Sequence, residues 1–499
     1  MSPAGERPAE APAAPGGPRG ASATPDPGGG ALASDELCWM SAIELAGLIR
    51  RKRVSPVEVV DAVLDRIERL NPALNAYVTV TADEARRAAR AAERALGRRA
   101  PVGPLHGVPF SVKDLVATRG VRTTFGTRLF ADTVPAEDAP MVERLRAAGG
   151  ILVGKTNTPA LGWLGVTHNL LFGPSRNPWR LDRTPGGSSG GAAAAVAAGL
   201  APIAIGTDGG GSIRIPAAFT GIFGHKPSYG RIPVYPASPT WSLSHIGPMT
   251  RTVADAALVL NVCAGPDERD PASLPRTGVD YVRAIRGGVK GLRVAYAEDL
   301  GNVTAVDAEV RRGAARAARV FRDLGCRVEV VAPRWPSPGE CWLALFTAGL
   351  GARLAPYRDR RDDLEPGLQQ LIDVAVAMPS TRFVQAWLDR LAWWQHPRGF
   401  FERYDLLLTP TVACPPFAVG LEHPGEVAGK TVGRYDWLPY TYPFNLTGQP
   451  AASVPCGFTR DGLPIGLQFV GRRFDDATVL RAAAAFERAR PWENVRPGV

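Results

Sequence analysis

The sequence predicts an α/β protein in which a central, twisted, mostly parallel mixed sheet is covered by helices on both faces. Apolar residues make up 45% of the 499 residues, which is enough for a large core. From residue 107 onward, short apolar runs bounded by glycine alternate with amphipathic patterns, as is typical of strands joined by helices. No fixed-period repeat interrupts the alternation, so we expect a single large α/β/α domain.

The folded part begins with helices. Residues 41–54 and 55–71 each open with a serine that suits a helix N-cap and continue with amphipathic spacing. Residues 82–100 carry the same spacing. A strand is expected at 107–115, where apolar residues follow a glycine and end at a lysine and an aspartate. Residues 139–154 predict a helix, a turn and a strand.

The rest of the chain continues the alternation. The alanine run 192–198 predicts a buried helix, and residues 201–208 predict a strand that enters a glycine loop. The later elements are a helix at 251–265, a strand at 292–296, a helix at 307–324, and strands at 326–331, 404–412 and 463–471.

The composition divides the chain into two parts. Residues 1–34 are mainly Pro, Ala and Gly, so they cannot offset the entropy of ordering by burial, and we expect a disordered tail without a secretory signal. The domain is expected at 35–492. No run is long and apolar enough to span a bilayer, so no membrane partner is expected. The six cysteines form no CxxC pair, which argues against a zinc site or disulfides and favours a cytoplasmic location.

The charge pattern argues against a nucleic-acid partner and identifies three lysines that deserve examination. The net charge is +10, but the cations are interspersed with acids, so no nucleic acid is expected. Only six of the 58 basic residues are lysines. Lysine can lose its proton in a protein and arginine cannot. The lysines within apolar or glycine-rich motifs, Lys113, Lys155 and Lys226, are therefore candidates for chemistry.

Two motifs match known patterns and are rejected. Residues 149–156, GGILVGKT, match a phosphate-binding loop, but a helix precedes the glycines and Pro159 follows, which reverses the order that cradles phosphate. Residues 186–190, GGSSG, match the serine elbow of α/β hydrolases, but no strand pattern precedes them. No later histidine is marked as a partner by its flanking sequence, and each is expected to be structural or exposed: His225, His245, His396 and His423.

A third motif fits catalysis better. Residues 205–217, IGTDGGGSIRIPA, place Ser212 behind three glycines at the end of a predicted strand. Consecutive glycines can present backbone N–H groups as a nest that holds an anion, including the oxyanion of a tetrahedral intermediate. A plain glycine turn would have the same sequence, so this motif alone leaves both interpretations open.

Three segments together, FSVKD, GGSSGG and GTDGGGS, resemble in order the amidase signature family of serine hydrolases. The resemblance extends to PLHGVPFSVKDL, GKTNTP, FGPSRNPW, LSHIGPMTRTVADAALVL, LTPT and FNLTGQPAASVPCGF, and it spans roughly residues 35–490. The family fold it implies is the α/β architecture expected above.

The resemblance implies a triad without histidine. Carried over by motif, Ser212 is the nucleophile, Ser188 the bridging serine and Lys113 the base, with a cis peptide expected at Gly187–Ser188. The N–H groups of Gly209, Gly210, Gly211 and Ser212 would form the oxyanion hole. Supporting roles are expected for Ser189, Thr207, Asp208 and Arg214. The family implies no cofactor and no metal.

The substrate is left open by the sequence. A small-molecule amide is the expected partner, and a homodimer is the assembly considered. A stand-alone amidase for an apolar or aromatic amide is favoured over the glutaminase subunit of a tRNA-dependent amidotransferase and over an acyltransferase with an amine acceptor. The variable region 335–440 is rich in aromatics that indicate either helix packing or an apolar acyl pocket: Trp335, Trp342, Phe346, Trp387, Trp393, Trp394 and Trp437.

Overall fold

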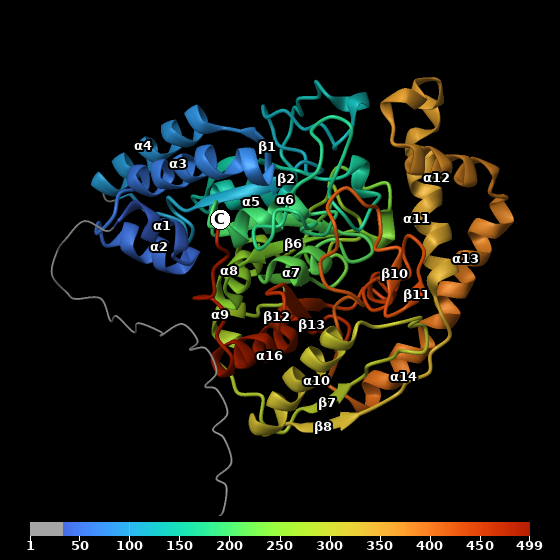
Figure 1. Ribbon diagram of the computed structural model, residues 1–499. Coiled ribbons are helices and arrows are strands. Elements are labelled where there is room, and N and C mark those ends of the chain that lie inside the picture. The colour runs from blue at the N-terminus through green and yellow to red at the C-terminus, as the bar shows by residue number, and fades with distance from the viewer. Residues whose placement is uncertain (1–32, 99) are drawn as a thin grey trace, which may run out of the picture. The chain divides into compact units, whose positions relative to one another are not determined.

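The computed structural model describes residues 33–98 and 100–499, and residues 34–499 form one compact unit (Figure 1). The predicted tail lies outside the described residues except for its last two positions, and Ser34 already begins a helix. Within the described part of the chain, no helix combines the length and apolar character that a bilayer crossing requires.

Two of the N-terminal helices begin at the caps that the sequence predicts. The Ser41 and Ser55 side chains each cap a helix. The Glu44 and Glu58 side chains accept a hydrogen bond from the backbone N–H of the capping serine. The helices are α1 (Ser34–Trp39), α2 (Ala42–Arg50), α3 (Pro56–Leu74), α4 (Ala82–Gly97), α5 (Pro140–Ala147), α6 (Gly190–Ala197), α7 (Arg214–Thr220), α8 (Val253–Cys263), α9 (Tyr281–Ala284), α10 (Ala308–Asp323), α11 (Gly339–Leu354), α12 (Pro366–Ala377), α13 (Ser380–Trp393), α14 (Gln395–Arg403), α15 (Pro443–Leu446) and α16 (Asp476–Ala489).

An 11-stranded sheet runs through the unit in the order β1-β3-β2-β4-β6-β5-β12-β13-β9-β7-β8. Its strands are β1 (Tyr77–Val80), β2 (Pro109–Lys113), β3 (Ile151–Thr156), β4 (Ile203–Asp208), β5 (Phe223–Lys226), β6 (His245–Thr250), β7 (Arg293–Tyr296), β8 (Arg327–Val330), β9 (Leu406–Pro410), β12 (Ala451–Phe458) and β13 (Pro464–Gly471). A separate hairpin pairs β10 (Glu426–Val427) with β11 (Lys430–Thr431).

The sheet is mixed, as predicted, but the expected majority of parallel pairs is wrong. Parallel pairs join β3, β2 and β4 on one side and β9, β7 and β8 on the other. Every neighbouring pair along the stretch of the sheet from β4 through β6, β5, β12 and β13 to β9 is antiparallel. The pair of β1 with β3 at the edge is also antiparallel. Connection length explains part of this pattern, because β12 and β13 are joined by the short turn at 459–463, which can only reverse the chain.

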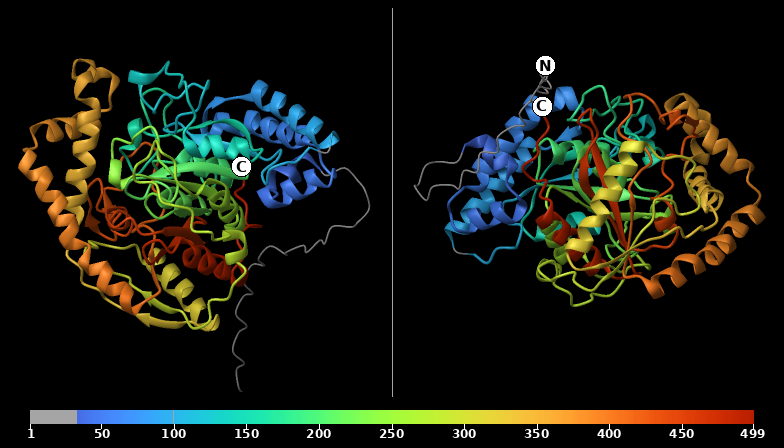
Figure 2. Two further views of the ribbon diagram at one scale, coloured as in Figure 1. Left: turned by 180° about the vertical axis from the view of Figure 1, so that it is seen from behind. Right: turned by 60° about the horizontal axis from the view of Figure 1, so that its bottom comes forward.

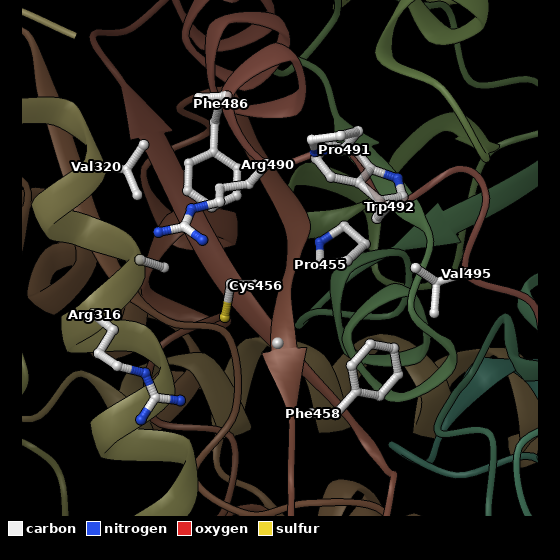
Figure 3. Close-up of a pocket in the computed structure, with 13 residues that line it drawn as sticks. Arg316, Val320, Pro455, Cys456, Phe458, Phe486, Arg490, Pro491, Trp492 and Val495 are labelled. Atoms are coloured by element: carbon white, nitrogen blue, oxygen red, sulfur yellow. The ribbon is translucent and has the colours of Figure 1, made fainter. Parts of the chain in front are cut away.

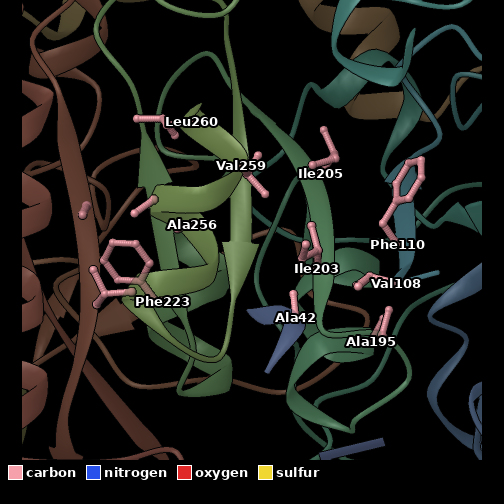
Figure 4. Packing of buried hydrophobic residues seen from close by; sticks show 14 of the residues in the cluster. Ala42, Val108, Phe110, Ala195, Ile203, Ile205, Phe223, Ala256, Val259 and Leu260 are labelled. Carbon is pink, nitrogen blue, oxygen red and sulfur yellow. The ribbon is translucent and has the colours of Figure 1, made fainter. Parts of the chain in front are cut away.

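Side chains on the strands alternate between the two faces of the sheet, and helices cover both faces as predicted. Ile203 and Ile205 of β4 enter a core with α8, α10 and α16, whereas Ala204 between them faces the other side. On β9, Leu406 and Leu408 enter the first core, and Leu407 enters a second core with α7 and α11–α13. Figure 4 shows part of the first core, with side chains from β2, β4 and α8.

The structure confirms that GGILVGKT is not a phosphate-binding loop. The segment follows α5 and forms β3, which is buried along its whole length. Lys155 lies inside this strand with no exposed side-chain surface. No helix begins at its end to present N–H groups to a phosphate.

Most of the aromatic side chains named in region 335–440 belong to the core. Helices α11–α14 lie on the opposite side of the unit from α1–α4 in each view (Figure 2). Trp335, Phe346, Trp393 and Trp437 are buried within the second core. Trp342 belongs to the same core but also contacts the glycine loop behind β4. Helix packing therefore accounts for most of these aromatic side chains.

Candidate active site

Two neighbouring parallel strands bring the predicted base to the glycine loop. Strand β2 pairs with β4, and they end at Lys113 and at Asp208. The carboxyl ends of adjacent parallel strands meet at one edge of a sheet, which is where ligands bind in open α/β sheets. The loop before α6 adds Ser188 and Ser189, and the peptide bond Gly187–Ser188 is cis, as the family resemblance implies.

Lys113 lies at the centre of three hydroxyl groups. Its Nζ is 2.7 Å from Ser188 Oγ, 3.0 Å from Ser189 Oγ and 3.0 Å from Thr207 Oγ1. The side chain is fully buried. Burial lowers the pKa of Lys113 well below its usual value, and the Asp208 carboxylate opposes that shift only in part. The structure therefore favours a neutral amine at this position.

The hydrogen bonds of Ser189 show that its hydroxyl does not face the lone pair of that amine. Ser189 donates its own proton to the Thr207 carbonyl at 3.2 Å, so it accepts from Lys113. A neutral amine has two N–H donors and one lone pair. With one N–H donated to Ser189, the lone pair is left for Ser188, the nearest hydroxyl at 2.7 Å, or for Thr207 at 3.0 Å.

Ser212 is the most exposed of the three predicted triad residues. It retains 9% of its surface, whereas Ser188 retains 1% and Lys113 none. The Ser212 carbonyl accepts from the Ser189 N–H at 3.2 Å, which holds its loop against the turn that carries Ser188. A substrate that arrives from solvent would therefore reach Ser212 first.

One of the four predicted oxyanion donors is already engaged. The N–H of Gly211 donates to the Asp208 carboxylate at 2.7 Å, and so it is not available to a substrate oxygen. This corrects the predicted set. The carboxylate reaches Gly211 because the glycine loop turns back on the residue that ends β4. Gly209, Gly210 and Ser212 are the remaining candidates.

The carbonyl groups of the glycine loop are held from outside the motif. Trp342 Nε1 donates to the Gly209 carbonyl at 3.0 Å, and Thr441 Oγ1 donates to the Gly210 carbonyl at 2.7 Å. The carbonyl and N–H of a trans peptide point in opposite directions. Fixing these oxygens therefore fixes the directions of the N–H groups that follow them.

Asp208 and Arg214, two predicted supporting residues, form a buried ion pair. Arg214 donates to both carboxylate oxygens of Asp208 at 2.9 Å, and neither side chain is exposed. Burial alone would raise the pKa of Asp208, but Arg214 and Asn445 hold it well below its usual value. The pair ties the glycine loop to the first turn of α7.

Three residues around the loop were not predicted as site residues, and a fourth, Trp342, was named only among the aromatics of region 335–440. Asn445 and Gln468 satisfy the Arg214 guanidinium at 2.7 Å each, and Thr441 and Trp342 hold the loop carbonyls. The signal that could have found the first two is the arginine itself, because a buried guanidinium requires several acceptors. Nothing in the local sequence pairs Trp342 with the loop.

The buried histidines are structural, as predicted. His245 Nδ1 faces the carbonyls of Asp208 and Leu243, and His225 lies 3.4 Å from the Asp476 carboxylate. Burial lowers the pKa of both rings. Among residues 33–98 and 100–499, no group of His, Cys, Asp and Glu has the arrangement of a metal site.

A cavity of about 590 Å³ lies apart from these residues (Figure 3). It is bounded by α10, by α16 and by the segment that follows α16. Its walls include Arg316, Cys456, Phe458 and Trp492, and none of the predicted triad or oxyanion residues lines it. It is not the place where Ser212 would meet a substrate.

The comparisons with known proteins agree with this geometry. A family model described as Amidase matches residues 58–480. The chain belongs to the amidase family. It is an amide-hydrolysing enzyme with the α/β fold of the amidase signature structures, and the family resemblance drawn from the sequence is confirmed.

Several relatives of this amidase match it along nearly their whole length. An acylamidase of Rhodococcus erythropolis is 41% identical over 93% of this chain and 98% of the relative. A glutamyl-tRNA(Gln) amidotransferase subunit from Moorella thermoacetica is 39% identical over 93% of this chain and 99% of the relative. The crystal structure of a bacterial aryl acylamidase of the amidase signature family has a TM-score of 0.86 and 39% identity, and covers 91% of this chain and 97% of that one.

Proposed function

We propose that this amidase cleaves a carboxamide C–N bond through an acyl-enzyme on Ser212, with Ser188 and neutral Lys113 as the proton relay. The observation that carries the proposal is the 2.7 Å contact between Lys113 Nζ and Ser188 Oγ in a fully buried setting. An ordinary lysine would be neutral in only about 0.04% of molecules at pH 7. The lowered pKa of Lys113 therefore supports a base that is ready to act.

The first half of the reaction forms the acyl-enzyme. Lys113 takes the proton of Ser188, Ser188 takes the proton of Ser212, and Ser212 Oγ attacks the amide carbon. The negative charge goes to the carbonyl oxygen, which faces the N–H groups of Gly209, Gly210 and Ser212. The relay then returns its proton to the amide nitrogen, the C–N bond breaks, and the amine leaves.

The second half restores the enzyme. Water gives a proton to the relay and attacks the acyl carbon, and the Ser212 oxygen leaves and regains that proton. The sum is amide plus water to carboxylic acid plus amine. An amine acceptor in place of water would make the protein an acyltransferase, and product analysis with a competing amine distinguishes the two.

We propose an apolar or aromatic amide as the substrate class. The similarity to the acylamidase and to the aryl acylamidase structure supports this choice. So does the aromatic side chain of Trp342 against the glycine loop. The second candidate is the glutaminase subunit of a tRNA-dependent amidotransferase, which the 39% identical relative supports.

The test combines a substrate panel with a covalent probe. Anilides, aliphatic amides and glutamine are offered to the pure protein, and we expect turnover of the anilides and none of glutamine. A fluorophosphonate should add to Ser212, as mapped by mass spectrometry. The adduct should be absent in Ser212→Ala and should form more slowly, by orders of magnitude, in Ser188→Ala. An adduct on Ser188 or Ser189 would overturn the assignment of the nucleophile.

A further inference from the structure

We infer that Trp342 is a positioning residue that aims the N–H of Gly210 at the oxygen of the reacting carbonyl. The inference rests on the proposed function, which assigns that N–H to the oxyanion. Trp342 lies 132 residues beyond Gly210 in the sequence, in the first turn of α11, and its side chain belongs to the second core.

The peptide planes of the glycine loop support this role. A peptide N–H points away from the carbonyl of the residue before it. Gly209 is the residue before Gly210, and its carbonyl accepts from Trp342 Nε1 at 3.0 Å. The indole N–H thus fixes the plane that carries the Gly210 N–H. Without that bond, glycine offers the plane the widest conformational freedom of any residue.

The neighbouring planes are held by other groups, so the task of Trp342 is distinct. The Asp208 carbonyl accepts from Asn445 Nδ2 at 2.9 Å, which sets the N–H of Gly209. The Gly211 carbonyl accepts from the Ile215 N–H at 2.7 Å, which sets the N–H of Ser212. For each of the three remaining oxyanion candidates, a different group therefore holds the peptide plane that carries its N–H.

The indole ring is also in contact with the loop. A Cβ on Gly210 would lie 2.6 Å from Trp342 Cζ2, closer than any carbon contact allows. The ring is held by stacked neighbours, Phe346 at 4.8 Å and Tyr442 at 5.2 Å between ring centroids. Trp342 is 3% exposed. The ring and the loop are thus complementary in shape, and the N–H adds direction to that fit.

The first experiment replaces the donor and keeps an aromatic ring. In Trp342→Phe, we expect kcat for an anilide to fall about tenfold, less than the 10²–10³ lost with a whole oxyanion donor, and KM to stay unchanged. Binding of a trifluoromethyl ketone should weaken by the same factor. Ser212 Oγ adds to the ketone carbon, the relay keeps the proton, and the ketone oxygen becomes the oxyanion, so its affinity reports on the hole.

The matched control is Trp393→Phe. Trp393 is a buried tryptophan of the same core, and its Nε1 donates to a carbonyl outside the loop, that of Pro336, at 2.8 Å. We expect both kcat and ketone affinity to stay at the wild-type level. An equal loss in both variants, or a loss in Trp342→Phe that falls only on KM, would overturn the inference and leave Trp342 as packing alone.

A second pair of variants tests the contact itself. Gly210→Ala alone should lose activity because its methyl group meets the indole. Trp342→Phe removes the Cζ2 position, so the double variant should be no slower than Trp342→Phe, a non-additive result. If the fold-losses in activity of the two single variants multiplied in the double variant, that result would contradict the contact.

If Trp342→Phe does not fold, β-(3-benzothienyl)alanine at position 342 keeps the shape of the indole and lacks the N–H. Wild-type ketone affinity in that protein would overturn the inference, and a loss of about tenfold would support it. Hydrolysis of amides by the wild-type enzyme tests the proposed function separately. The role of Trp342 and the proposed function can therefore be refuted independently of each other.

Discussion

At the scale of single residues, the proposed mechanism depends on one lysine, Lys113, whose pKa burial lowers. Lys113 shares its fully buried state with Lys155 on the next strand, yet the two have different partners. Lys155 Nζ bonds to Val116 O, Thr118 and Thr123, at 2.6–3.0 Å, and none of these belongs to the proposed relay. Burial lowers the pKa of Lys155 to about 8. A lowered pKa therefore does not by itself identify the base, and our assignment of Lys113 rests on its contact with Ser188.

The first prediction concerns Lys113→Arg. Arginine keeps the charge but cannot give up its proton, so we expect the variant to be as inactive as Lys113→Ala. In the wild type, kcat/KM should rise with pH through one ionisation that lies below the usual lysine range, because only neutral Lys113 accepts a proton. The measurement is a pH–rate profile with an anilide, together with the rate of fluorophosphonate labelling.

Lys155→Arg is the control for that experiment. It alters an equally buried lysine outside the relay, so it should change the melting temperature and leave the midpoint of the pH–rate profile where it is in the wild type. Activity in Lys113→Arg, or a flat wild-type profile from about pH 6 to 9 with chemistry rate-limiting, would remove Lys113 as the base.

At the scale of elements, the connection from β4 to α7 is organised by one carboxylate. Asp208 ends the strand, accepts from the N–H groups of Gly211 and Ile213, and receives the Arg214 side chain from the first residue of the helix. The strand, the glycine loop and the helix thus share one buried charge pair. The loop owes its shape to this pair as much as to its glycines.

The second prediction is that Asp208→Asn destabilises the fold by about 3–5 kcal/mol, because it leaves the Arg214 guanidinium buried without its counter-charge. The pKa of Asp208 is held low in the folded state, so the pair stabilises above the unfolded pKa and is lost only as pH falls through the folded value. The difference in unfolding free energy between Asp208→Asn and wild type should therefore have its largest value at pH 7. Denaturant melts at several pH values measure it.

Asp182→Asn is the matched control for Asp208→Asn. Asp182 pairs with Arg180 at 3.1 Å, but its side chain is 58% exposed. Exposed pairs contribute little, so we expect the free energy of unfolding of Asp182→Asn to match that of the wild type. A comparable loss in both variants would mean that burial of the Asp208 pair is not what stabilises the loop.

The third prediction concerns Glu365, the residue that precedes α12. Burial, with help from Glu422, raises the pKa of Glu365 to about 7. A raised carboxyl pKa favours the protonated form, so the wild type loses stability as pH rises from the unfolded pKa to the folded one. Glu365→Gln has no carboxylate to bury. Its free energy of unfolding, measured relative to wild type, should therefore be about 1–3 kcal/mol higher at pH 8 than at pH 5.

Thermal or denaturant unfolding at the two pH values checks the Glu365 prediction. Glu402→Gln serves as the control, because Glu402 is 66% exposed and pairs with Arg398 on one helix face. Because this carboxylate is mostly in solvent, its replacement should not reproduce the gain expected for Glu365→Gln. A gain in Glu365→Gln that is the same at both pH values would show that the buried charge is not its source.

At the scale of the whole molecule, the sequence predicted what depends on local pattern. The capped helices, the strand that ends at Lys113 and the glycine loop before Ser212 are contiguous, so periodicity and motif suffice. What it could not predict depends on contacts between distant segments. Trp342, Thr441 and Asn445 reach the loop from more than 130 residues away. The antiparallel centre of the sheet was missed for the same reason, since strand order is not a local property.

The last prediction concerns the residues before the described unit. Residues 1–32 contain almost no large apolar side chain, so burial cannot offset the entropy of ordering them. A variant that begins at Ala33 should therefore keep its melting temperature and its kcat/KM within about twofold of the full chain. The contrasting variant ends the deletion at Met40 and removes α1. Leu37 and Cys38 of α1 are buried in the first core, and Asp35 pairs with the buried Arg66, so this variant should lose several degrees of melting temperature. If the shorter deletion destabilised the protein as much as the longer one, the compositional argument about residues 1–32 would be wrong.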